Sequence, residues 1–166
     1  MDDRDVVAMQ IGRETRAFLR VAVRCPFGYP AVTEQAPYDE NRDPFPTTYY
    51  VTCRYLVTAL SRLEATGGVE RWSEAARADD ELAASLARAN DDQRAIRRRL
   101  AGEGLWPDGG ASLELGIGGS SRGGSLKCLH AHAAFALARP DYELGRRILV
   151  EVEPLWPPDR CCFASG

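Results

Sequence analysis

The hydrophobic pattern of the sequence changes its period near Cys53, and this change restricts the possible fold more than any other feature. Before it, short apolar segments at 18–24, 31–35 and 47–52 are separated by Pro, Gly and Asn, a pattern typical of strands and turns. After it, apolar residues recur every three or four positions, as on the buried face of a helix. The sequence therefore predicts an α+β domain, with a small N-terminal β-hairpin or three-strand sheet packed against a predominantly helical remainder.

One helix is expected before the sheet and five after it. The expected helices lie at 3–11, between Cys53 and Gly67, at 70–78, from Asp79 to about Gly102, at 126–139 and at 142–152. Glycine dominates 102–124, which predicts a loop. The length of 166 residues fits one domain. We place this domain at 1–152, followed by an extended C-terminal tail at 153–166 that contains three prolines.

Composition and charge exclude several classes of protein. Apolar residues make up 45% of the chain and the net charge is only −3, with acids and bases interspersed, so no overall attraction to nucleic acid or anionic membranes is expected. The basic run 97–99 is interpreted as a solvated helix face. Apolar runs fall short of the roughly 20 residues that span a bilayer, and the acidic N-terminus lacks the apolar region of a signal peptide. We expect a cytoplasmic protein without nucleic-acid binding or membrane insertion.

The two histidines and one of the five cysteines fall within residues 127–132. If a helix with Ser125 as its N-cap covers this stretch, Cys128 and His132 are four residues apart and share a face, whereas His130 points away. A Cys/His pair at this separation can hold one metal ion. The same segment therefore offers a candidate metal site.

Two further cysteines lie at positions that fix the direction of a side chain. Cys25 is on a Pro–Gly turn at the end of a strand, and Cys53 is at the start of a helix. With Cys128 and His132 they would make a Cys₃His set, which is typical of tetrahedral zinc, so zinc is the expected cofactor. The alternatives are a reactive Cys–His pair without metal and plain packing of the thiols in the core.

The glycine-rich stretch 116–125 precedes the helix that carries the histidines. Its backbone N–H groups at Gly118 and Gly119, together with Arg122 and Lys127, predict a site for an anion. The stretch lacks the Gly-Lys-Ser/Thr ending of a Walker A loop and follows no clear strand. A bare flexible loop is the alternative interpretation.

Several blocks of sequence occur together in a characteristic order. They are Cys25–Gly28, Pro44–Thr47 running into Tyr49–Cys53, Ser61–Glu64, Gly116–Gly119 and Lys127–His132. Their succession, from about residue 10 to residue 150, resembles the bacterial domain of unknown function 501 family. The resemblance implies a small bacterial cytoplasmic protein and supplies no catalytic residues. The long Ala/Arg helix and the tail with Cys161 and Cys162 depart from the family pattern.

Two functions are compatible with these features. In the first, zinc fastens the hairpin to the helices of a binding or adaptor module that recognises a protein partner; this asks less of the sequence, because no acid/base pair has obvious catalytic spacing. In the second, a small enzyme uses a metal, or the thiolate of Cys53 or Cys128, in a pocket beneath the glycine loop. His130 or His132 would then move a proton while the loop holds a small anionic ligand.

Overall fold

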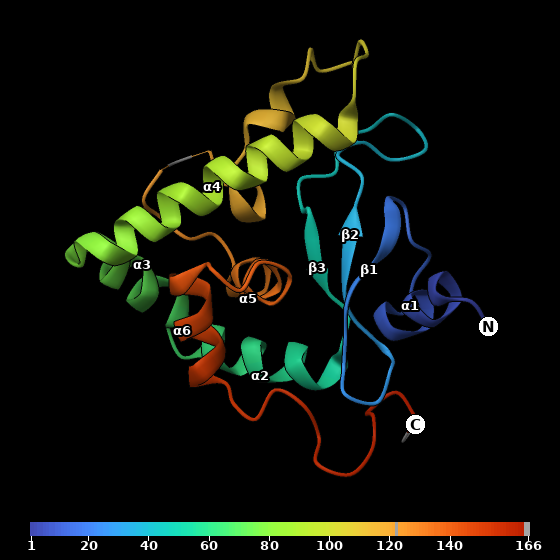
Figure 1. Ribbon diagram of the computed structural model, residues 1–166, viewed down its shortest axis with the longest axis vertical. Coiled ribbons are helices and arrows are strands. Elements are labelled where there is room, and N and C mark those ends of the chain that lie inside the picture. The colour runs from blue at the N-terminus through green and yellow to red at the C-terminus, as the bar shows by residue number, and fades with distance from the viewer. Residues whose placement is uncertain (122, 165–166) are drawn as a thin grey trace.

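The computed structural model describes residues 1–121 and 123–164. It confirms the α+β fold: a three-stranded antiparallel sheet near the N-terminus lies beside a larger helical part (Figure 1). The elements in chain order are α1 Asp3–Ile11, β1 Phe18–Arg24, β2 Pro30–Gln35, β3 Tyr49–Val51, α2 Arg54–Ala65, α3 Gly68–Ala78, α4 Asp80–Ala101, the 3₁₀ turns η1 Ala111–Glu114 and η2 Ile117–Gly119, α5 Leu129–Ala138 and α6 Glu143–Glu151. Most of these bounds lie within two residues of the expected ones.

The sheet has the order β1-β2-β3, as expected for a hairpin extended by one strand. Every residue of β2 is buried, because this strand lies between two neighbours and beneath other elements. Val32 pairs with Val51 of β3, and only two residues separate Val51 from the start of α2. The sheet therefore fixes the position of the first turn of α2.

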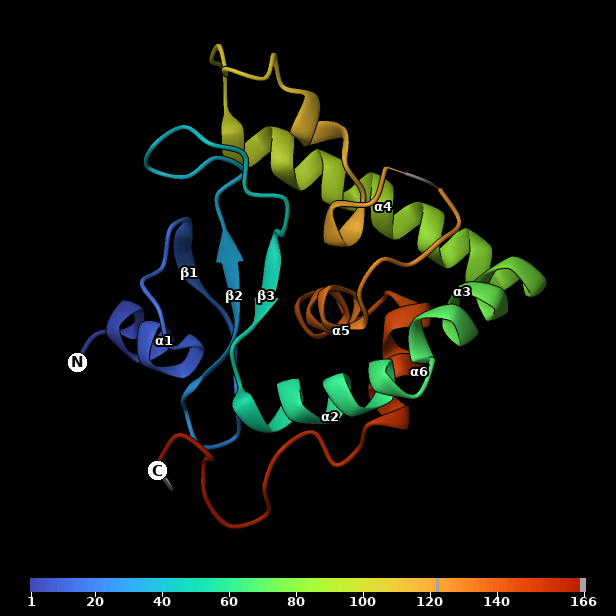
Figure 2. The same cartoon turned by 180° about the vertical axis from the view of Figure 1, so that it is seen from behind.

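Helix α5 is the centre of the helical part, and β3, α2 and α6 pack around it (Figures 1 and 2). Its sequence is almost free of charge and seven of its ten residues are buried, as expected for a helix that is apolar on all sides. The ring of Phe135 meets Tyr49 edge-on at 5.6 Å between centroids. Gly145 of α6 allows a close crossing, since a Cβ there would lie 2.6 Å from the Cβ of Ala136.

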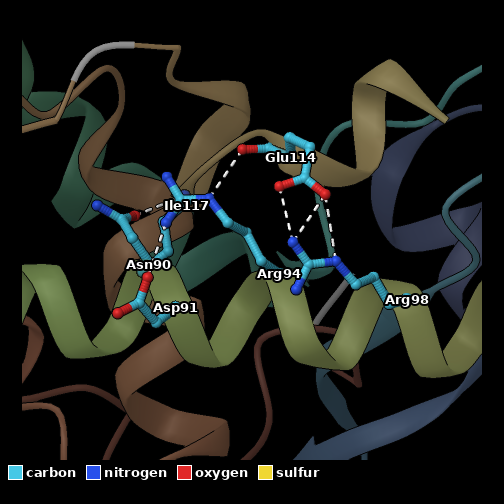
Figure 3. A network of polar contacts seen from close by, with 6 residues as sticks. All are labelled: Asn90, Asp91, Arg94, Arg98, Glu114 and Ile117. Carbon is cyan, nitrogen blue, oxygen red and sulfur yellow. Dashed lines mark hydrogen bonds and ion pairs between the residues drawn. The ribbon is translucent and has the colours of Figure 1, made fainter.

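Polar side chains of α4 hold the loop that follows it (Figure 3). The Asn90 side-chain oxygen accepts a hydrogen bond from the Ile117 N–H at 3.0 Å, and Arg94 donates to the Glu114 carbonyl at 2.8 Å. Arg98 forms an ion pair with the Glu114 carboxylate at 2.7 Å. The glycine-rich loop is thus anchored at its start, before it reaches α5.

The interpretation of the basic run as a solvated face is wrong for Arg97. Its side chain is fully buried, and its guanidinium donates to the carbonyls of Phe45 at 2.9 Å and Ser112 at 3.2 Å. Burial lowers the pKa of this guanidinium below its usual value. Arg97 therefore joins two loops inside the protein, while Arg98 and Arg99 are exposed.

The tail from residue 153 to 164 forms neither helix nor strand and runs past α2 toward the β1–β2 turn (Figure 1). It packs on the body, with Cys161 buried and the Phe163 ring 5.4 Å from the ring of Tyr29. Among the helices formed by the described residues, none has the length and apolar character needed to cross a membrane.

Candidate functional site

The structure does not bring Cys25, Cys53, Cys128 and His132 to one point. Within residues 1–121 and 123–164, one group of three or more His, Cys, Asp or Glu side chains has its ligand atoms within 4.8 Å of one another, and it consists of Glu64, Cys128 and His130. Only Cys128 is common to the predicted set and this group.

His132 lies in the packing between α5 and α6. Its Nδ1 forms a hydrogen bond of 2.6 Å with the hydroxyl of Tyr142, the residue that precedes α6. Complete burial lowers the pKa of His132 to about 3, so the ring is neutral at ordinary pH. This histidine holds two helices together and is not directed at the other predicted ligands.

Cys25 and Cys53 each contact a cysteine of the C-terminal tail. The Sγ of Cys25 is 3.9 Å from that of Cys161, and the Sγ of Cys53 is 3.9 Å from that of Cys162. The two thiols of Cys25 and Cys53, which the sequence predicts as metal ligands, therefore contact the thiols of Cys161 and Cys162.

The reason for the different grouping is the start of α5. Cys128 is the residue before the helix, with extended backbone angles of φ −155° and ψ 127°, so the four-residue spacing to His132 does not place both on one helical face. The predicted cap, Ser125, lies outside the helix. The first helical N–H, that of Leu129, donates instead to Oε2 of Glu64 on α2 at 2.8 Å. A side chain from a distant helix therefore caps α5.

The three clustered side chains meet around one ring nitrogen. His130 Nδ1 lies 3.8 Å from the Sγ of Cys128 and 2.9 Å from Oε1 of Glu64. The side chains of His130 and Glu64 are each about one quarter exposed. The cluster is thus close to the surface but partly withdrawn from water.

The second ring nitrogen of His130 faces α2. Nε2 is 3.3 Å from the carbonyl of Val57 and 3.2 Å from the hydroxyl of Ser61. A carbonyl can only accept, so the contact with Val57 places a hydrogen on Nε2. Burial lowers the pKa of His130, but contacts with Cys128, with the Glu64 carboxylate and with the Val57 carbonyl outweigh it and raise the pKa above the usual value.

A pocket of about 290 Å³ opens beside the cluster, with Cys128 and His130 in its wall. The rest of its lining is largely apolar and aromatic: Thr47, Tyr49, Tyr50, Val51, Val57, Gly118 and Ala131. A mainly apolar pocket with a few polar groups at one place is the usual form of a small-molecule site.

The glycine-rich loop reaches this pocket at Gly118. This residue has φ +72°, and a Cβ on it would lie 3.4 Å from the Cβ of Ala131 and 3.9 Å from that of Cys128. At Gly119 a Cβ would lie 4.0 Å from the Nζ of Lys127. Gly118 is therefore next to the cluster, whereas Gly119 and Lys127 line a second hollow of the surface. The fourth residue of the predicted anion site, Arg122, lies outside the described residues.

Glu64 was not predicted from the sequence as part of any site. One signal was present: Val57, Ser61 and Glu64 follow at intervals of four and three residues, so they line one face of α2. Nothing in the sequence alone indicated that this face meets the start of α5.

Most of the chain matches a known protein family. The match to a family described as a protein of unknown function, DUF501, extends over residues 21–149. The chain belongs to the DUF501 family. Glu64, Cys128 and His130 lie inside the matched range, whereas Cys161 and Cys162 lie beyond it. No curated protein and no solved structure matched the chain.

Proposed function

We propose that this DUF501 protein is a small zinc-dependent enzyme in which Cys128, His130 and Glu64 hold one metal ion. One coordination position would remain open toward the adjacent pocket. The observation that carries the proposal is the convergence of one sulfur, one imidazole nitrogen and one carboxylate oxygen within 4.8 Å of one another, with Cys128 and His130 in the wall of the pocket.

The separations fit a tetrahedral zinc ion after a small adjustment. With Zn–S of about 2.3 Å and Zn–N and Zn–O of about 2.0–2.1 Å, tetrahedral angles place S and N about 3.6 Å apart and N and O about 3.4 Å apart. The separations here are 3.8 Å between Cys128 Sγ and His130 Nδ1, and 2.9 Å between that nitrogen and Oε1 of Glu64. For these two pairs, changes of about 0.5 Å or less suffice. The sulfur and the carboxylate oxygen, which lie within 4.8 Å of each other, would approach to about 3.6 Å. Zinc would replace the proton that Nδ1 shares with the carboxylate.

The surroundings of the ligands also support a metal. A histidine that binds zinc through one nitrogen commonly donates from the other to a carbonyl, which fixes the orientation of the ring. His130 meets this condition through the Val57 carbonyl. The second oxygen of Glu64 is held in the same way by the Leu129 N–H. Two of the three ligands are therefore oriented before any metal arrives.

The number of ligands favours an enzyme with a catalytic zinc site over an adaptor with a purely structural one. Structural zinc sites have four protein ligands, whereas catalytic sites have three and keep a position for water or substrate. Within the described part of the chain, no fourth His, Cys, Asp or Glu atom joins the group. A zinc-bound water has a pKa near 7 and is a nucleophile at neutral pH, so hydrolysis is the reaction class that we propose.

A metal-free thiol enzyme is the less favoured alternative. A nucleophile–histidine–acid relay uses the two ring nitrogens separately, one for the nucleophile and one for the acid. Here both Cys128 and Glu64 face Nδ1, and Nε2 is occupied by α2. This arrangement suits convergence on a metal better than proton relay.

The pocket and the loop suggest the kind of substrate. The walls formed by Tyr49 and Tyr50 would take an apolar or aromatic portion of a small molecule. Gly118 lines this pocket, and Gly119 and Lys127 line a second hollow that would take an anionic group of the same molecule. A small anionic ester or amide with an apolar portion has both features.

Cobalt substitution tests the proposal. The purified chain is loaded with Co²⁺ and its visible spectrum is recorded with and without thiocyanate. We expect a sulfur-to-cobalt charge-transfer band that is lost in the His130→Gln variant and kept in the control variant Cys162→Ser. If one coordination position is open, thiocyanate should bind there and shift the cobalt bands. The zinc form should also hydrolyse anionic aryl esters faster than the metal-free form. A cobalt spectrum that does not respond to thiocyanate would contradict the open position, and failure to bind cobalt would contradict the site.

A further inference from the structure

The C-terminal tail brings two adjacent cysteines to two cysteines of the body. Cys162 contacts Cys53, which precedes α2, and Cys161 contacts Cys25, which follows β1; both Sγ–Sγ separations are 3.9 Å. The paired residues are 109 and 136 positions apart in the chain. Contacts over such distances arise only because the tail returns to the sheet and α2 (Figure 1).

The two pairs differ in their access to solvent. Cys25 and Cys161 are both buried, at 6% and 4% exposed. In the other pair Cys53 is buried at 3% but Cys162 is only partly buried. Of the two residues, Cys162 is therefore the more accessible to a small molecule in solution.

We propose that Cys162 and Cys53 form a thiol–disulfide exchange site, which a small-molecule disulfide such as glutathione disulfide oxidises to a cross-link between the tail and the start of α2. The cross-link requires the two sulfurs to approach from 3.9 Å to about 2.05 Å. Cys162 is in a segment without helix or strand, so rotation of its side chain and a small shift of the tail can supply this movement. Exchange of this kind is the usual role of a disulfide in a reducing compartment.

The exchange has two steps that balance. The Cys162 sulfur loses its proton to water and attacks one sulfur of glutathione disulfide, which forms a mixed disulfide and releases one glutathione thiolate. Cys53 then loses its proton and attacks the Cys162 sulfur, which forms the internal disulfide and releases the second glutathione thiolate. The two protein thiols lose two electrons, glutathione disulfide gains them, and its two thiolates take up the two protons.

The order of the two steps follows from burial. Burial is the main cause that raises the pKa of Cys53 to about 12, so this thiol is almost wholly protonated at neutral pH. The thiolate is the attacking species, so the buried Cys53 reacts slowly and takes the second role. Some mixed disulfide on Cys162 should therefore accumulate before the internal bond closes.

The experiment uses the full chain, incubated with glutathione disulfide and analysed by intact mass and by non-reduced peptide mapping. We expect first the mass of one added glutathione, and then a product two hydrogens lighter than the reduced protein, with a peptide that links Cys53 to Cys162. Cys162→Ser should form neither species at these positions. Cys161→Ser and Cys128→Ser are the matched controls, and both should still form the link.

Cys53→Ser places a hydroxyl at a buried position and can destabilise the fold. The decisive variant is therefore Cys162→Ser, in which the replaced residue is partly exposed. A mixed disulfide on Cys162 that never resolves would overturn the proposal, as would a cross-link that joins Cys25 to Cys161 while Cys162 stays reduced. A metal ion retained by the reduced chain and released in Cys162→Ser would also overturn it, since the thiols would then be ligands.

Discussion

Replacing Glu64 tests whether α2 and α5 meet as the structure places them. In Glu64→Ala the Leu129 N–H loses a charged acceptor at 2.8 Å, which costs about 1.5–3 kcal/mol. The ion pair with His130, whose two side chains are one quarter exposed, adds about 1 kcal/mol or less. We therefore expect the free energy of unfolding to fall by about 1.5–4 kcal/mol in total.

The matched variant is Glu64→Gln. Its amide oxygen can still accept from the Leu129 N–H, but the negative charge is lost, so the expected cost is about 1–2 kcal/mol. Both variants should be measured by urea denaturation with a chelator present, so that metal does not contribute, and the denaturant slope should stay unchanged.

The charge on His130 adds a pH dependence to this comparison. Its pKa is raised in the folded protein, so the ion pair contributes fully below the unfolded value of 6.5 and is lost as pH rises through the raised value. The stability difference between wild type and Glu64→Gln should shrink over that window. Equal costs for the Ala and Gln variants, or costs below about 0.5 kcal/mol for both, would refute the assignment of Glu64 as the cap of α5 and the partner of His130.

Three other predictions concern the frame around the site. Arg97→Met removes the donor from the carbonyls of Phe45 and Ser112 and should lower the free energy of unfolding, measured by urea denaturation, by about 2–5 kcal/mol. Arg98→Met removes only an exposed ion pair and should lower it by less than about 1 kcal/mol. Similar losses for the two variants would contradict their different burial. Gly145→Ala places a methyl group 2.6 Å from the Cβ of Ala136 and should cost about 1–3 kcal/mol by the same assay, and a neutral result would show that α6 does not cross α5 so closely. The pKa of His132 is lowered from 6.5 to about 3, so between these pH values the unfolded chain binds a proton that the folded protein does not. As pH falls through this range, the free energy of unfolding of the wild type should decrease by up to about 1.4 kcal/mol per pH unit more than that of His132→Gln. Parallel curves of stability against pH would contradict the burial of the ring.

Local pattern was enough to predict most of the fold. The strand at 18–24 and the helix at 3–11 have the bounds that the sequence predicted. The spacing of the apolar residues and the turn residues beside each element determine these bounds locally. The start of α5 was placed three residues too early. Leu126 continues the apolar pattern, but its N–H bonds to the Ser73 side chain and the helix begins only where Glu64 caps it. That cap comes from 65 residues away and has no local signature.

The true start of α5 also determines which side chains meet at the site. Sequence spacing selected Cys128 with His132 because both were assigned to one helix, whereas the extended backbone at Cys128 brings it to His130, two residues on. Cys25 and Cys53 were correctly recognised as lying at a turn and a helix start, but their partners are in the tail. A single sequence gives side-chain direction within an element and does not give the contacts between elements.

The most direct test of the proposed metal site is X-ray absorption at the zinc edge of the metal-loaded chain. We expect one sulfur at about 2.3 Å and nitrogen or oxygen neighbours at about 2.0–2.1 Å, with the sulfur shell lost in Cys128→Ser and unchanged in Cys25→Ser. Two or more sulfurs around the zinc, or a sulfur shell that survives Cys128→Ser, would contradict the convergence of Cys128, His130 and Glu64 on one ion.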